Sequence, residues 1–144
     1  DTFARLVSAV FRELVGGIEY VLLYGERSLS RDADAEVAVI RDDLVSLEET
    51  FEAELNDAEI ASALAPIHLL CNMMLEPTAD VVAAHAASER RDAANQNADA
   101  VVSTHAIFRL LTLRTGDSDA RKWVKARTKA RKHEVKKRGA ESEL

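Results

Sequence analysis

Residue types that bind metals or attack substrates are few in this chain of 144 residues. It has four His and one Cys, and His68 and Cys71 are spaced i, i+3 along a predicted helix. A zinc site needs four protein ligands, or three ligands and a water molecule. The other histidines, His85, His105 and His133, are scattered along the sequence. We therefore expect no metal site and no cofactor.

Cys71 is the one candidate for a nucleophile. A nucleophilic thiol needs a neighbouring base or a lowered pKa. Leu69, Leu70, Met73 and Met74 surround Cys71 in the sequence, and the residue falls on an apolar stripe. We expect it to be a small buried apolar residue. A single cysteine also excludes an intramolecular disulfide and fits a reducing compartment.

The acidic residues offer two further possibilities for chemistry. Asp32, Asp34 and Glu36 alternate like the start of a calcium loop, but the glycine and the final glutamate of such a loop are missing. Acids at a helix N-terminus, favoured by the helix dipole, explain them better. The acids between residues 42 and 54 lie on a polar helix face with nothing to raise a pKa. We expect no catalytic residues, no small-molecule substrate and no enzyme.

The elements that would position these residues are helices. Apolar residues make up 47% of the chain, charged residues 31%, and there are only five Gly and two Pro. A helix is predicted over residues 33–55, with Ser30 or Asp32 as its N-cap and an acidic outer face. Its apolar stripe, with steps of three and four, is Val37, Ile40, Leu44, Leu47, Phe51 and Leu55.

Similar patterns predict the remaining helices. The first covers residues 2–15 with a wide stripe of Phe3, Leu6, Val7, Val10, Phe11, Leu14 and Val15, and continues over 18–24 after an interruption or kink at Gly16-Gly17. The next has Asp57 as its N-cap and buries Ile60, Leu64, Ile67, Cys71 and Met74. Pro66 is expected to kink this helix near its second turn or to start a new helix there. A short helix that carries Val81, Val82 and His85 follows, with Thr78 as its N-cap. Another helix starts at Asp99. The last helix covers residues 119–138, with Asp117 or Ser118 as its N-cap.

These helices predict an all-α fold, an antiparallel bundle of five to seven helices in one domain over residues 1–144. Loops are expected at Gly25–Ser30, Glu76–Thr78, Ser88–Asn97 and Thr115–Ser118, with a glycine cap at Gly116. The sequence contains no run of about 18 apolar residues, so we expect no membrane-spanning helix. Because the sequence lacks an initiator Met, we expect it to be the C-terminal part of a longer chain.

Charge is distributed unevenly. Residues 1–120 carry 22 acids and nine basic residues, a net charge of −13, whereas residues 121–138 carry ten basic residues and one acid, a net charge of +9. The candidate lipid- or partner-binding residues on this basic terminal helix are Arg121, Lys122, Lys125, Lys129, Lys132 and Lys136. Trp123, Val124 and Arg127 are expected to dock the helix on the body.

Two uses of the basic helix are open. In the first use, the helix packs against the acidic helix 33–55 or stays solvated. In the second, it binds anionic lipid or an acidic partner, and each basic residue near a membrane contributes about 1 kcal/mol of binding free energy. Nucleic-acid binding is not expected, because the helix carries only one aromatic residue and the body is acidic.

Two patches resemble a known family. The first is Asp42-Asp43-Leu44-x-x-Leu47-x-x-x-Phe51 with Ile60, Leu64, Pro66-Ile67 and Leu69-Leu70 after it. The second is Ile107-Phe108-x-Leu110-Leu111-x-Leu113-Arg114-x-x-Asp117, then Ala120-Arg121. Together, over about residues 20–126, they resemble the C-terminal region of vesicle-tethering subunits, the Sec-six type of the exocyst above all. The related MUN domain has a similar order, so either membership is open.

The resemblance implies the end segment of a helical rod in a multisubunit complex. Such a complex tethers secretory vesicles to the plasma membrane during exocytosis. The expected partners are the other subunits, SNARE proteins and an anionic membrane surface. The expected location is cytoplasmic, peripheral at the plasma membrane or at vesicle contact sites. The family carries no catalytic residues in this region.

Overall fold

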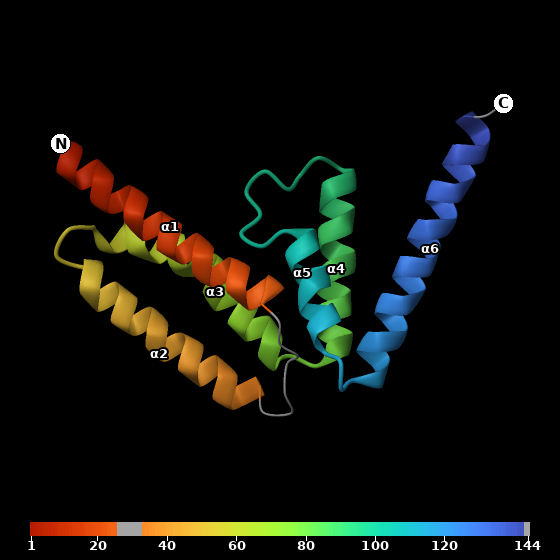
Figure 1. Cartoon of the computed structure of the whole chain (residues 1–144), viewed down its shortest axis with the longest axis horizontal. Helices are drawn as coiled ribbons and strands as arrows, with labels where there is room; N and C mark the ends of the chain where they lie inside the picture. Colours follow the sequence, from red (N-terminus) through yellow and green to blue (C-terminus); the bar gives the residue numbers. More distant parts are fainter. Residues whose placement is uncertain (26–32, 143–144) are drawn as a thin grey trace.

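The computed structural model describes residues 1–25 and 33–142, which form six α-helices and no strand (Figure 1). The prediction of an all-α bundle with five to seven helices is confirmed. Helices α2 and α3 run antiparallel, as do α4 and α5, and α3 contacts α1, α2 and α5. The helices are α1 (Thr2–Tyr24), α2 (Ala33–Phe51), α3 (Asp57–Leu75), α4 (Thr78–Ala93), α5 (Thr104–Leu113) and α6 (Ser118–Ser142).

Helix α3 is the centre of the core. Its predicted stripe is buried as expected, from Ile60 through Cys71 to Met74. The helix continues through Pro66 as one element. It is also the one helix among the described residues that is long and apolar enough to cross a membrane. Since its apolar side chains pack against three neighbouring helices, we interpret it as the core helix of the bundle.

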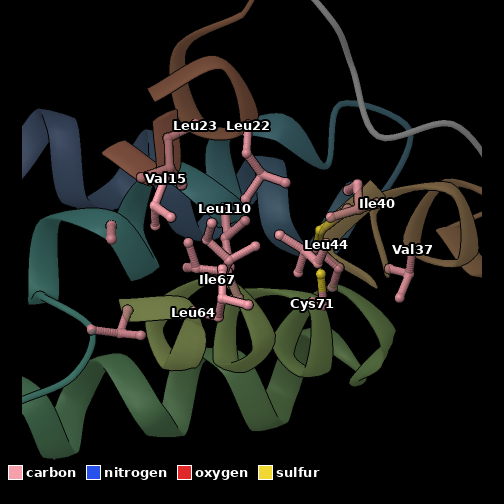
Figure 2. Close-up of a cluster of buried hydrophobic side chains, with 14 of the residues drawn as sticks. Val15, Leu22, Leu23, Val37, Ile40, Leu44, Leu64, Ile67, Cys71 and Leu110 are labelled. Carbon is pink, nitrogen blue, oxygen red and sulfur yellow. The ribbon is translucent and has the colours of Figure 1, made fainter. Parts of the chain in front are cut away.

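Helix α2 packs its predicted stripe on α3. Val37, Ile40 and Leu44 are buried, and Leu47 and Phe51 are partly buried against the same core. The helix ends at Phe51 rather than at residue 55, although the predicted stripe residue Leu55 is still buried. Figure 2 shows the meeting point, where side chains of α3 face residues of α1, α2 and α5. The labelled residues are Val15, Leu22, Leu23, Val37, Ile40, Leu44, Leu64, Ile67, Cys71 and Leu110.

Helix α1 differs from the prediction in two ways. It is continuous across Gly16-Gly17, so no interruption occurs there. Only part of its wide stripe is buried: Phe11 and Val15 lie in the core, whereas Phe3 and Leu6 are exposed. The apolar arc of α1 is too wide for the body to cover, because α3 and α5 contact it from one side.

The prediction of a loop over Ser88–Asn97 is wrong for its first residues, which are helical. Helix α4 continues to Ala93, and Ser88 is completely buried. The polar residues have partners that sequence could not reveal: Thr104 contacts the Ser88 hydroxyl and donates to Asp92 at 2.6 Å. The hydrogen bond from Thr104, and after it the one from Asn97, lower the pKa of Asp92. Asn97 also donates to Asp92, so the connection up to α5 is tied to the end of α4.

Helix starts depart from the predictions at three places. Asn56, rather than Asp57, caps α3, and its side chain accepts from the amide of Glu59 at 2.7 Å. Pro77 precedes α4, so Thr78 is the first helical residue and not the cap. Helix α5 starts at Thr104 behind Ser103 instead of at Asp99.

The remaining predicted caps have mixed outcomes. Asp117 caps α6 as predicted. Helix α5 ends before Gly116, as the predicted glycine cap requires. Such a cap also needs a positive φ at the glycine, and no described glycine has one, so the predicted cap is not formed. Gly25 ends α1, whereas the rest of the predicted loop and the proposed caps Ser30 and Asp32 lie outside the described residues.

Candidate functional site: the projecting basic helix

A junction of four helix ends sets the direction of α6. The Arg114 guanidinium donates to the backbone carbonyl of Met73 at 2.7 Å and to the Thr78 hydroxyl at 3.0 Å. Thr78 in turn donates to Asp117. The other Asp117 oxygen accepts from the amide of Asp119 at 2.9 Å. The carbonyl of Met73 at the end of α3 and side chains at the ends of α4, α5 and α6 therefore hold the start of α6 in place.

The electrostatics of this junction follow from its burial and hydrogen bonds. Burial lowers the pKa of Arg114, with the neighbouring carboxylate of Asp117 opposing the shift. The hydrogen bond from Thr78 lowers the pKa of Asp117, and the amides of α6 act in the same direction. Asp117 is thus kept as a carboxylate at the N-terminus of α6, where the helix dipole favours a negative charge.

The first two turns of α6 dock on the body as the sequence predicted. Ala120 is fully buried, and Trp123 and Val124 pack against the core. The Trp123 ring lies 4.9 Å from the His85 ring in an edge-to-face arrangement and 6.0 Å from the Phe108 ring. One small residue and one aromatic residue thus attach α6 to α4 and α5.

A charged contact extends this docking by one turn. Arg127 forms an ion pair with Glu89, which also lies 3.3 Å from Nδ1 of His85. Burial lowers the pKa of His85 below its usual value, although Glu89 opposes that shift. From Lys125 to Glu141 every residue of α6 is exposed.

The six candidate residues lie on one side of this exposed helix. At 100° per residue they fall within an arc of about 100°. The docked residues Ala120, Trp123 and Val124 lie on the opposite side, so the candidate residues face away from the body. We call this surface the lysine face; it consists of Arg121, Lys122, Lys125, Lys129, Lys132 and Lys136, all of them exposed.

The structure does not place α6 on α2. Figure 1 shows α6 extending away from α4 at one end of the molecule, with α2 at the other end. The predicted intramolecular contact with the acidic helix is therefore wrong. The reason is geometric: the junction at Arg114 and the docking of Trp123 direct α6 away from the body before its charged part begins.

The residues considered for chemistry are not brought together. Cys71 is fully buried, burial raises the pKa of its thiol, and it packs in the core as predicted. His68 is exposed on another side of α3. Across residues 1–25 and 33–142, no three His, Cys, Asp or Glu side chains form a group able to hold a metal.

Two important residues were not recognised as such from sequence. Arg114 and Thr78 connect helix ends that are 36 residues apart, a pairing that only the fold creates. The signal in the sequence is the pair Arg114 and Asp117, which lies within the second patch.

Comparisons with protein-family models, with curated proteins and with solved structures found no match to this chain.

Proposed function

We propose that this chain is an interaction domain whose lysine face binds an anionic membrane surface. The observation that supports the proposal is the orientation of α6: its docked side and its lysine face are opposite, and the helix projects beyond the body. The lysine face extends over residues 121–136, about 22 Å at 1.5 Å per residue.

Electrostatics alone give this face a moderate affinity for lipid. Each Lys or Arg close to an anionic membrane contributes about 1 kcal/mol, so six residues contribute about 6 kcal/mol. That corresponds to binding in the range of tens of micromolar, which is weak and reversible. The acidic body, with a net charge of −13 over residues 1–120, is repelled from the same membrane. Together these effects orient the molecule with α6 toward the lipid.

The chemistry of α6 favours a diffuse anionic surface over a structured ligand. Beyond Val124, α6 has no aromatic residue, and its apolar side chains are alanines and the exposed Val135. A helix that inserts into lipid needs a continuous apolar face. Recognition of bases would need aromatic or base-reading side chains among the charges. A row of lysines without either suits charge-driven contact with lipid headgroups.

Vesicle flotation tests the proposal. The chain should float with vesicles of about 30% phosphatidylserine and not with neutral phosphatidylcholine vesicles, and flotation should fall with salt. Reversing Lys125, Lys129 and Lys132 to Glu should abolish flotation. The matched control reverses Arg131, Lys137 and Arg138, which changes the net charge equally on other sides of α6 and should weaken flotation less. Equal flotation of the wild-type chain and the lysine-face variant would refute lipid binding through this face.

A scaffold role in a vesicle-tethering complex is the second candidate, and it stays a prediction of the family resemblance. The observation in its favour is that α1 leaves an apolar face uncovered, as a subunit of an assembly does. Affinity purification of the tagged chain from its source cell tests it. Recovery of tethering subunits would support the role, and their absence under mild salt conditions would contradict it.

A further inference from the structure

Helix α1 carries an apolar stripe that the molecule leaves in solvent. Phe3 is 63% exposed, Leu6 and Val21 are 59% exposed, and Val10 and Leu14 are 45% exposed. Steps of three and four residues place them on one side of the helix, next to the side that faces the core. We call this surface the α1 stripe; it consists of Phe3, Leu6, Val10, Leu14, Tyr20, Val21 and Tyr24.

The size of the α1 stripe suits a protein interface. Its seven side chains expose on the order of 700 Å², whereas the largest apolar patch on a typical monomer is about 300–600 Å². A standard interface buries about 800 Å² on each partner. The stripe therefore provides most of the area that one side of a stable dimer needs.

The glycines in the middle of α1 are unexplained within the monomer. Glycine weakens a helix interior relative to alanine. A Cβ added to Gly16 or Gly17 would meet no atom within 4 Å, and neither residue has a positive φ. The monomer thus needs a glycine at neither position. A second helix packed against the α1 stripe would use Gly17, which lies on the same side of α1 as the stripe, because a helix can approach its bare backbone closely.

The α1 stripe is complementary to itself when reversed. If two α1 helices pack antiparallel, Phe3 lies opposite Tyr24, Leu6 opposite Val21, and Val10 opposite Gly17. A large residue at one end thus meets a large residue at the other, and the valine meets the glycine gap. A twofold axis passes between residues 13 and 14, where Leu14 of each copy lies opposite the exposed Glu13 of the other. Such an isologous contact closes into a dimer.

A hollow at the end of α1 suits the residue that this arrangement places there. A shallow pocket of about 250 Å³ lies between α1 and the start of α5. Its aromatic side chains include Tyr20, Tyr24 and His105, and the Tyr24 and His105 rings stack 6.1 Å apart. In the antiparallel pairing the partner's Phe3 lies beside this pocket. Aromatic anchors in pockets are typical of the residues that dominate binding energy.

We propose that this chain forms a twofold dimer in which two α1 helices pack antiparallel through their stripes, with Phe3 of each copy at the aromatic pocket of the other. The α1 stripe and the lysine face lie on different helices, so the dimer does not depend on lipid binding.

Sedimentation equilibrium tests the dimer. The wild-type chain should be dimeric well below ~100 μM, because an interface of this size usually gives at least micromolar affinity. Leu6→Glu and Leu14→Glu should each raise the dissociation constant at least about 100-fold, since every substitution acts twice at a twofold interface. The matched control is Val39→Glu on α2, a residue 62% exposed and outside the stripe, which should leave the constant unchanged. Circular dichroism should show the same helix content in all variants.

Cysteine cross-linking tests the direction of the pair. Leu14→Cys, next to the twofold axis, should form a disulfide-linked dimer by itself. Phe3→Cys should not, because the two copies of residue 3 would be about 30 Å apart. A mixture of Phe3→Cys with Tyr24→Cys should cross-link. The wild-type chain, with its buried Cys71, is the control for background oxidation.

Two results would overturn the proposal. One is a wild-type chain that stays monomeric at ~100 μM, which would leave the α1 stripe to a different partner. The other is a dimer that is insensitive to Leu6→Glu and Leu14→Glu, or that cross-links through Phe3→Cys alone. A dimer that is insensitive to the two glutamate substitutions would have its interface elsewhere. A dimer that cross-links through Phe3→Cys alone would have its α1 helices parallel.

Discussion

Helices α1 and α6 both present an open face to solvent, and the two faces have opposite chemistry. The outer side of α1 carries large apolar residues from Phe3 to Tyr24, interrupted by Glu13, while its inner side carries core residues such as Phe11. Helix α6 is docked only through its first turns and then continues with charged residues. An apolar face gains free energy by leaving water, whereas a lysine face gains by meeting negative charge.

This difference separates the two proposed interactions experimentally. Salt screens charges over a Debye length of about 8 Å at physiological ionic strength. Binding through the lysine face should weaken as salt rises, whereas pairing through the α1 stripe should not. A single chain therefore carries one salt-sensitive and one salt-insensitive surface, and each can be removed without the other.

The largest expected effect contrasts the two sides of α1. Phe11→Ala should lower the free energy of unfolding by about 3–5 kcal/mol, because it leaves a cavity where a fully buried ring touches Phe51. Phe3→Ala, in the Leu14→Glu background that cannot pair, should change it by less than about 0.5 kcal/mol. Urea unfolding measures both. Equal losses for the two variants would contradict the two-sided description of α1.

A smaller effect is expected at the junction that directs α6. Arg114→Ala removes one of the two donors to the carbonyl of Met73, which keeps the amide of Glu76, and also removes a hydrogen bond to Thr78, at a cost of about 2 kcal/mol. Arg121→Ala, an exposed arginine one turn into α6, is the control and should have almost no effect. Urea unfolding measures the free energy of unfolding of both variants. Similar values for the two would show that the junction does not stabilise the fold.

A pH effect is expected where α6 meets α4. Folding lowers the pKa of His85, so the unfolded chain binds more protons than the folded one below about pH 6.5. The contribution of neutral His85 is complete above that pH and is lost as the pH falls. Thermal unfolding should therefore show a larger drop in Tm between about pH 7.5 and 5.5 for the wild-type chain than for His85→Phe.

The control for this pH effect is a histidine in solvent. His68→Phe changes an exposed residue of α3 and should keep the pH dependence of the wild-type chain. If both substitutions reduce the pH dependence equally, the effect does not come from His85.

The smallest effect is expected from the free end of α6. Removing residues 129–144 should change the free energy of unfolding by less than about 0.5 kcal/mol, because residues 129–141 are exposed. The same truncation should abolish vesicle flotation. A truncation from residue 119 also removes Ala120 and Trp123 and should destabilise the body clearly in urea unfolding. If loss of 129–144 destabilised the body as much, α6 would have a contact that the structure lacks.

Much of the fold was predictable because helical periodicity is local. The stripe from Val37 to Leu44 and the stripe from Ile60 to Met74 are buried as predicted, since residues three and four apart share one side of a helix. The docking residues Trp123, Val124 and Arg127 were also predicted correctly. Helix ends were less predictable: the polar stretch from Ser88 to Asp92 is helical because its partners lie on another segment.

The sequence by itself determined which residues are apolar, which are basic, and that both kinds recur at helical spacing. Only the tertiary structure decided which apolar residues are covered, because burial depends on neighbours that come from distant segments. For that reason Phe11 and Phe3 have different roles on one helix. The same holds for α6: its charge is evident in the sequence, but its direction away from the acidic α2 is decided by Arg114, Thr78 and Asp117, which meet only in the folded chain.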